Sequence, residues 1–101
     1  MDQPVPKSLT IVARIQAKAG QEGMAEAELH KLIEPSRRDR GCLEYVMHAS
    51  LETPGLFLFY ENWETKADWE AHMETEHLQE WKAVAADLAA NVEIMQMEKI
   101  G

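Results

Sequence analysis

Two side chains in this sequence of 101 residues combine a titratable group with an expected buried position. His72 falls between Trp69 and Met73 in a stretch with helical spacing, so it is predicted to face a sheet. It would be either a core histidine bonded to a strand carbonyl or a general base at a pocket wall. Glu61 lies within the apolar segment FLFYENW, where a carboxylate must be paired or have a raised pKa. It would either bond to a neighbouring strand, or orient a histidine or take a proton itself.

The other ionisable and metal-binding residue types predict no cofactor and no metal ion. His30 and His77 are most simply a solvated helix residue and a helix-start residue. His72 and His77 are five residues apart, which misses the same-face spacing of three or four on a continuous helix. The single cysteine, Cys42, excludes cysteine-rich zinc motifs and an intrachain disulfide. No glycine-rich phosphate loop, dinucleotide fingerprint or nucleophile elbow is present.

The elements that must position these residues follow the order β-α-β-β-α-α-β. Period-two alternation predicts the strands, and apolar residues at helical spacing predict the helices. The predicted strands cover residues 9–18, 42–51, 56–64 and 92–97, and the predicted helices cover residues 21–40 and 65–88, the latter interrupted at 74–77. This order predicts an α+β, ferredoxin-like split βαβ fold, with an antiparallel four-stranded sheet and helices on one face.

The pairing of the two middle strands decides which side chains share a face. The turn Glu52-Thr53-Pro54-Gly55 favours a hairpin in which Leu51 opposes Leu56. One face would then carry His48 together with Phe59, Glu61 and Trp63, and Tyr45 would lie on the other face. A slip of one residue would exchange these partners. The aromatic residues could line a site for a flat ligand or form plain core; they are Tyr45, Phe57, Phe59, Trp63, Trp69 and Trp81.

Composition limits the partners and the domain organisation. Eighteen acidic residues against ten basic ones give a net charge of −8, which disfavours nucleic acid and anionic membranes. No apolar run approaches the ~20 residues of a membrane span, and the N-terminus has no signal-peptide pattern, so a cytoplasmic protein is expected. Residues 1–7 are predicted to be a loose arm before a single domain at 8–101. Both faces of the third strand are apolar, which predicts a homodimer.

An ordered set of motifs resembles the antibiotic biosynthesis monooxygenase domain. The motifs are V-A-R-I-x-x-K-x-G at 12–20, R-x-x-G-C-L-x-Y at 38–45, F-x-x-Y-E-x-W at 57–63 and K-A-D-W-x-x-H at 66–72. The resemblance implies a dimeric α+β barrel with a pocket between the sheet and the helices of each subunit. It also implies oxidation of a quinol or related aromatic substrate by O₂ without metal or flavin.

With the buried polar residues above, this resemblance implies a cofactor-independent monooxygenase that acts on a small aromatic or polyketide-type substrate. His72 and Glu61 are the predicted catalytic residues. The predicted substrate-binding residues are Tyr45, His48, Phe59, Trp63 and Trp69. The alternatives are a small-metabolite isomerase, which would turn over without O₂, and a non-catalytic ligand-binding dimer of the same fold.

Overall fold

The computed structural model describes residues 8–101, and the predicted arm at 1–7 lies outside the described residues. It contains four strands and four helices. In chain order they are β1 (Leu9–Ala17), α1 (Glu22–His30), α2 (Ile33–Arg37), β2 (Cys42–Ala49), β3 (Leu56–Trp63), α3 (Lys66–Met73), α4 (Glu76–Leu88) and β4 (Ala89–Met97). The predicted α+β, ferredoxin-like fold is confirmed.

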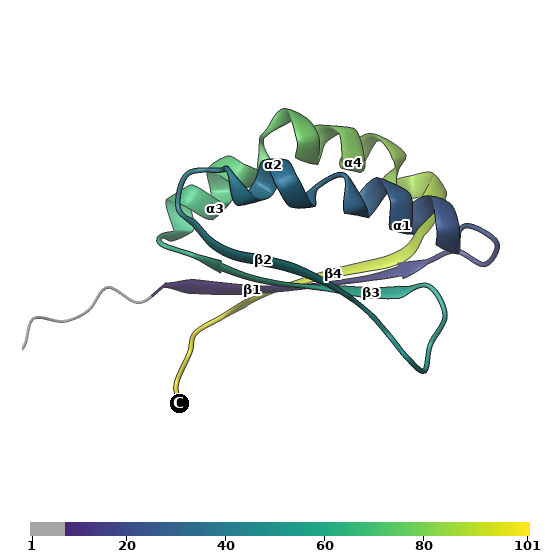
Figure 1. The fold of residues 1–101 in the computed structure, drawn as a ribbon, viewed down its shortest axis with the longest axis horizontal. Coiled ribbons are helices and arrows are strands. Elements are labelled where there is room, and N and C mark those ends of the chain that lie inside the picture. The colour runs from purple at the N-terminus through teal and green to yellow at the C-terminus, as the bar shows by residue number, and fades with distance from the viewer. Residues whose placement is uncertain (1–7) are drawn as a thin grey trace, which may run out of the picture.

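The four strands form one antiparallel sheet in the order β2-β3-β1-β4, and the helices lie together on one face of it (Figure 1). The alternation in β1 decides which face is covered. Ile11, Ala13, Ile15 and Ala17 are buried against the helices, whereas Arg14 is exposed. The alternation that predicted this strand therefore also identifies the core side of the sheet.

The predicted register of the β2–β3 hairpin is wrong by one residue. Tyr45 lies opposite Glu61, and His48 lies opposite Leu58. The loop begins earlier than predicted, because the Ser50 side-chain oxygen accepts hydrogen bonds from the backbone N–H groups of Glu52 and Thr53. Since side chains alternate between faces, this shift brings Tyr45 to the helix side with Glu61 and moves His48 to the opposite face.

The first predicted helix, 21–40, is two helices in the structure. α1 ends at His30, and α2 begins at Ile33, two residues before Pro35. A proline in the first turn of a helix removes an N–H that has no partner within the helix in any case. Pro35 is thereby accommodated without a kink further along. The short α2 then leads into the loop that carries Asp39.

The second helical region is interrupted where the sequence predicted. The Thr65 side chain accepts a hydrogen bond from the backbone N–H of Asp68 at 3.1 Å, so the predicted cap of α3 is confirmed. α3 ends at Met73, and α4 begins at Glu76 after an extended Thr75. The Thr75 hydroxyl donates to the carbonyl of His72 at 2.7 Å. The break changes the direction in which the following side chains point.

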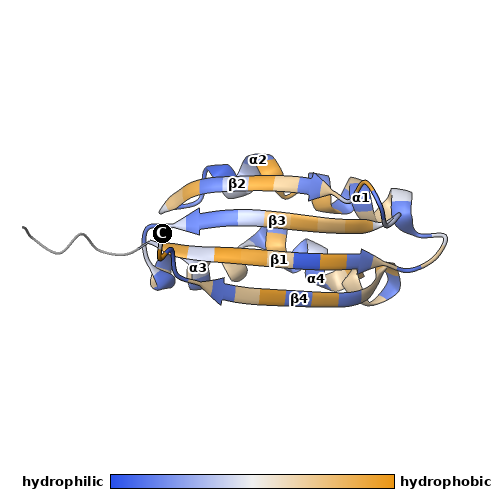
Figure 2. Ribbon diagram, turned by 90° about the horizontal axis from the view of Figure 1, so that it is seen from below, coloured by the Kyte–Doolittle hydropathy of each residue, from blue (hydrophilic) through white to orange (hydrophobic). Residues whose placement is uncertain are grey.

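The sheet face opposite the helices carries an apolar row. Val46, Tyr60, Val12 and Met95 are successive cross-strand partners from β2 to β4, so they lie on one line across all four strands. Figure 2 shows this uncovered face of the sheet. Among the described residues, every helix is too short or too polar to span a bilayer.

Candidate active site

A cavity of about 270 Å³ lies between the sheet and the helices. Its wall is mainly apolar, with contributions from all four strands and from α1, α3 and α4. Val92 and Ile94 of β4 line it and are each more than 40% exposed, so the cavity opens to solvent beside β4. The polar side chains in the wall are Tyr45, Glu61, His72 and Lys82. A mostly apolar cavity with a few convergent polar groups is the usual form of a small-molecule site.

Glu61 is a buried carboxyl group in the second half of β3. Its side chain accepts a hydrogen bond from the indole Nε1–H of Trp63 at 2.9 Å, and the residue is only 4% exposed. Burial raises its pKa from 4.5 to about 7, and the hydrogen bond from Trp63 opposes this only in part. Near neutral pH Glu61 is therefore able both to donate and to accept a proton.

His72 is held by a carboxylate rather than by a strand carbonyl. Its Nδ1 lies 2.7 Å from Oδ2 of Asp39, and the side chain is almost fully buried. Burial lowers the pKa of His72, and hydrogen bonding and charge from Asp39 counteract part of that effect. The ring also packs on Trp63 with a centroid distance of 4.4 Å. Asp39 thus fixes an Nδ1–H tautomer, and within residues 8–101 Nε2 has no hydrogen-bond partner.

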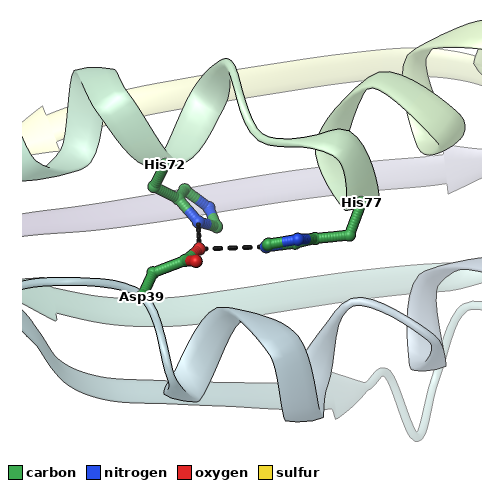
Figure 3. Close-up of side chains that lie close together, drawn as sticks. All are labelled: Asp39, His72 and His77. Atoms are coloured by element: carbon green, nitrogen blue, oxygen red, sulfur yellow. Dashed lines mark hydrogen bonds and ion pairs between the residues drawn. The ribbon is translucent and has the colours of Figure 1, made fainter.

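His77 contacts the same carboxylate oxygen of Asp39. Its Nε2 lies 2.9 Å from the same Oδ2 of Asp39 and 3.1 Å from the Thr75 hydroxyl. Figure 3 shows both imidazole rings directed at Asp39. Neither Asp39 nor His77 lines the cavity, so only His72 belongs to both places. The three residues present one oxygen and two nitrogens within 4.8 Å of one another.

Two further acidic groups in this region remain protonated near neutral pH. Burial, together with the nearby charge of Glu61, raises the pKa of Tyr45 well above its ordinary value. Burial likewise raises the pKa of Cys42 to about 11, and its thiol lies 3.7 Å from the carbonyl oxygen of Glu44. Tyr45 can therefore act as a neutral hydrogen-bonding group at the wall, and Cys42 is not an activated nucleophile.

The structure brings together five of the seven predicted site residues. Those that line the cavity are Tyr45, Phe59, Glu61, Trp69 and His72. Trp63 lies behind the wall, where it bonds to Glu61 and supports His72. The predicted position of His48 is wrong: the corrected register places it on the other face, where it is exposed.

Asp39 and the proximity of His77 to His72 are not predicted by the sequence. Asp39 interrupts a short run of arginines, and no local spacing relates it to residues 33 and 38 positions later. The signal for His77 was Thr75, a residue type that caps helices and can start a new one. The spacing that separates His72 from His77 holds only on a continuous helix, and the predicted interruption at 74–77 removes it, since α3 ends at Met73 and α4 begins at Glu76.

The sequence model of one protein family, described as antibiotic biosynthesis monooxygenase, matches residues 8–84. The chain belongs to the antibiotic biosynthesis monooxygenase family. The resemblance drawn from the sequence motifs is thereby confirmed. The matched residues contain Glu61, His72 and Asp39, and they end within α4.

Solved structures of similar proteins share the fold. The crystal structure of PA3566 from Pseudomonas aeruginosa is 33% identical, with a TM-score of 0.93 over 98% of this chain and 100% of that one. A crystal structure described as an antibiotic biosynthesis monooxygenase has a TM-score of 0.85 at 22% identity, over 92% of this chain and 99% of that one. An uncharacterised Synechocystis protein is 27% identical over 91% of this chain, which spans 63% of that protein's length. One of these structures is thus described as a monooxygenase, and it shares its fold with this protein.

Proposed function

We propose that this protein is a cofactor-independent monooxygenase that oxidises a quinol or a related electron-rich phenol with O₂. The observation that carries this proposal is the pairing, in one apolar cavity, of a buried imidazole with an oriented proton and a carboxyl group whose pKa is about 7. Family membership supports the same class of reaction.

Proton removal is the first task of such an enzyme. Because Asp39 accepts the Nδ1–H of His72, the lone pair of this imidazole is on Nε2. A substrate hydroxyl in the cavity would donate its proton to Nε2, and the imidazolium that forms would be stabilised by the Asp39 carboxylate. Asp39 in this reaction is a positioning residue, because it does not line the cavity.

Electron transfer then requires only the substrate and O₂. A deprotonated quinol is electron-rich enough to give an electron to O₂, and the resulting radical pair can form the new carbon–oxygen bond. The apolar wall would keep water away from this pair. The peroxide that forms keeps one oxygen on the substrate carbon, and its O–O bond breaks as that carbon loses a hydrogen. Glu61, with a pKa of about 7, would supply the proton with which the other oxygen leaves as water. Phe59 and Trp69 would hold the flat ring of the substrate.

The open sheet face favours a homodimer. The row formed by Val46, Tyr60, Val12 and Met95 is apolar across the sheet, and a second copy would remove it from water. The same association would add to the core of a small domain, which buries a limited share of its surface alone.

Oxygen uptake by metal-stripped protein tests this proposal. A panel of hydroquinones and anthrone-type phenols would be assayed against a no-enzyme control for autoxidation. His72→Ala should lose turnover, whereas His48→Ala, a change of the same residue type on the opposite face, should keep it. Full activity of the His72 variant, or no uptake with any substrate, would contradict the proposal. Substrate conversion without O₂ uptake would instead favour an isomerase.

A further inference from the structure

We propose that Asp39, His72 and His77 form a binding site for one divalent ion of the zinc class, on the outer side of the cavity wall. The proposal does not rest on the oxidation chemistry above. It differs from the sequence prediction of no metal, which assumed that His72 and His77 lie on different sides of one helix.

Two of the three donor separations, those that involve Asp39, are slightly shorter than coordination requires, and all three donor atoms lie within 4.8 Å of one another. Oδ2 of Asp39 lies 2.7 Å from Nδ1 of His72 and 2.9 Å from Nε2 of His77. Zinc binds nitrogen and oxygen at about 2.0–2.2 Å, which places neighbouring ligand atoms about 3 to 3.5 Å apart. Small rotations of three side chains would therefore open the hydrogen-bonded cluster into a coordination site.

The types of donor define the class of ion. Two imidazole nitrogens and one carboxylate oxygen suit zinc, nickel, copper and cobalt, whereas calcium and magnesium prefer oxygen alone. The ion would take the place of the protons that the two rings share with Asp39. With three protein ligands, water would complete the coordination.

The position of the cluster lets an ion enter from solvent and lets the bound ion connect three segments of the chain. His72 is almost completely buried, whereas the side chains of Asp39 and His77 are 17% and 18% exposed, so an ion can enter from their side. The three residues come from the α2–β2 loop, the end of α3 and the start of α4. One ion would join these segments.

The cavity and the ion would use different nitrogens of His72. The ion would bind Nδ1, where Asp39 now accepts a hydrogen bond, and Nε2 would stay available to the cavity. Asp39 and His77 do not line the cavity, so the ion would not contact a substrate there. Its effect would be to fix the ring of His72 and the two helices beside it.

Metal titration of the tag-free, chelator-stripped full chain tests the site directly. Co²⁺ would be followed by its visible absorption and Zn²⁺ by calorimetry, in a buffer that does not bind metal. We expect one equivalent to bind, with Zn²⁺ displacing Co²⁺, and we expect the melting temperature to rise. The imidazole NMR signals of His72 and His77 should both shift, while those of His30 and His48 should not.

Three variants locate the bound ion. Asp39→Asn and His77→Gln should each weaken binding by about tenfold or more, because each removes one ligand. His30→Gln, the same change on an exposed helix position, should bind as the unchanged protein does. Circular dichroism would check the fold of each variant, and the NMR shifts of the unchanged protein give the answer if Asp39→Asn does not fold.

The proposal is overturned if the unchanged protein binds less than one equivalent, or if the signals of His72 and His77 do not move. It is also overturned if folded His77→Gln keeps full affinity. These measurements need no substrate, so absence of O₂ uptake leaves them unaffected. Conversely, absence of metal binding does not weaken the proposed oxidation, which is assayed on metal-stripped protein.

Discussion

Replacing Glu61 by glutamine should make the protein more stable at pH 8 and should leave its stability almost unchanged at pH 4. An acid whose pKa is higher in the folded state than in the unfolded state binds more protons when folded, between the two pKa values. Stability therefore falls as pH rises from 4.5 towards 7, and the full penalty is present above that range. At 1.4 kcal/mol per pH unit, this penalty is about 3.5 kcal/mol as an upper value. Glutamine has no such penalty and can still accept the hydrogen bond from Trp63.

Urea unfolding at pH 4, 5, 6, 7 and 8 would measure this difference at one fixed protein concentration, since association would add to stability. Burial of neutral His72 affects the pH dependence of stability in the opposite direction, because its lowered pKa costs stability as pH falls below about 6.5. Subtracting the unfolding free energies of the two proteins at each pH cancels the contribution of His72. Glu70→Gln, a change on an exposed position of α3, is the matched control and should show no such trend. A Glu61→Gln difference that stays constant from pH 4 to 8 would refute the raised pKa.

Three further predictions test other parts of the structure. Gly41→Ala should lower the free energy of unfolding measured in urea by about 1–2 kcal/mol or more, because Gly41 has a φ of +78° and an added Cβ would collide with Asp68. Gly23→Ala, where nothing lies within 4 Å of an added Cβ, is the control, and equal stability of the two variants would contradict this prediction. Tyr60→Glu should convert the proposed dimer to a monomer in light scattering, because the variant would bury a charge in the apolar row. An unchanged molar mass would show that this face is not the dimer interface. Ala85→Phe should fill the cavity and abolish binding of an aromatic probe in a fluorescence titration, whereas Ala83→Phe, on an exposed position of the same helix, should not.

Most of the fold follows from periodicity, because each strand and helix buries one face. The alternation in β1 and the Thr65 cap of α3 are local signals, and the structure contains both. The hairpin register depends instead on how the loop satisfies its backbone groups. The Ser50 side chain accepts two backbone N–H groups, and this lengthens the loop beyond the predicted turn. One residue of difference was enough to exchange Tyr45 and His48 between the faces.

The buried residues of the candidate site were easier to predict than their partners. Glu61 and His72 are noticeable in the sequence because polar residues at apolar positions need an explanation. Their partners are determined by long-range packing. Asp39 contacts His72 across 33 residues of sequence, and it follows a short helix, α2, that the sequence did not separate from α1. On a continuous helix His72 and His77 would be about 140° apart, since each residue turns the helix by 100°. The extended backbone at Thr75 removes that separation.

The two nitrogens of His72 would let one side chain take part both in the proposed reaction and in the proposed metal site. A neutral imidazole carries one proton, and the partner of Nδ1 decides that the lone pair is on Nε2. Asp39 fixes this tautomer with a hydrogen bond, and a metal ion on Nδ1 would fix the same arrangement by taking the place of the proton. An ion would also lower the basicity of Nε2, because it withdraws electron density from the ring. Metal-loaded protein should therefore remove a substrate proton more slowly than metal-stripped protein at the same pH. Comparing O₂ uptake by the two forms with one active quinol measures this effect, and equal rates at full metal occupancy would show that the ion does not act through His72.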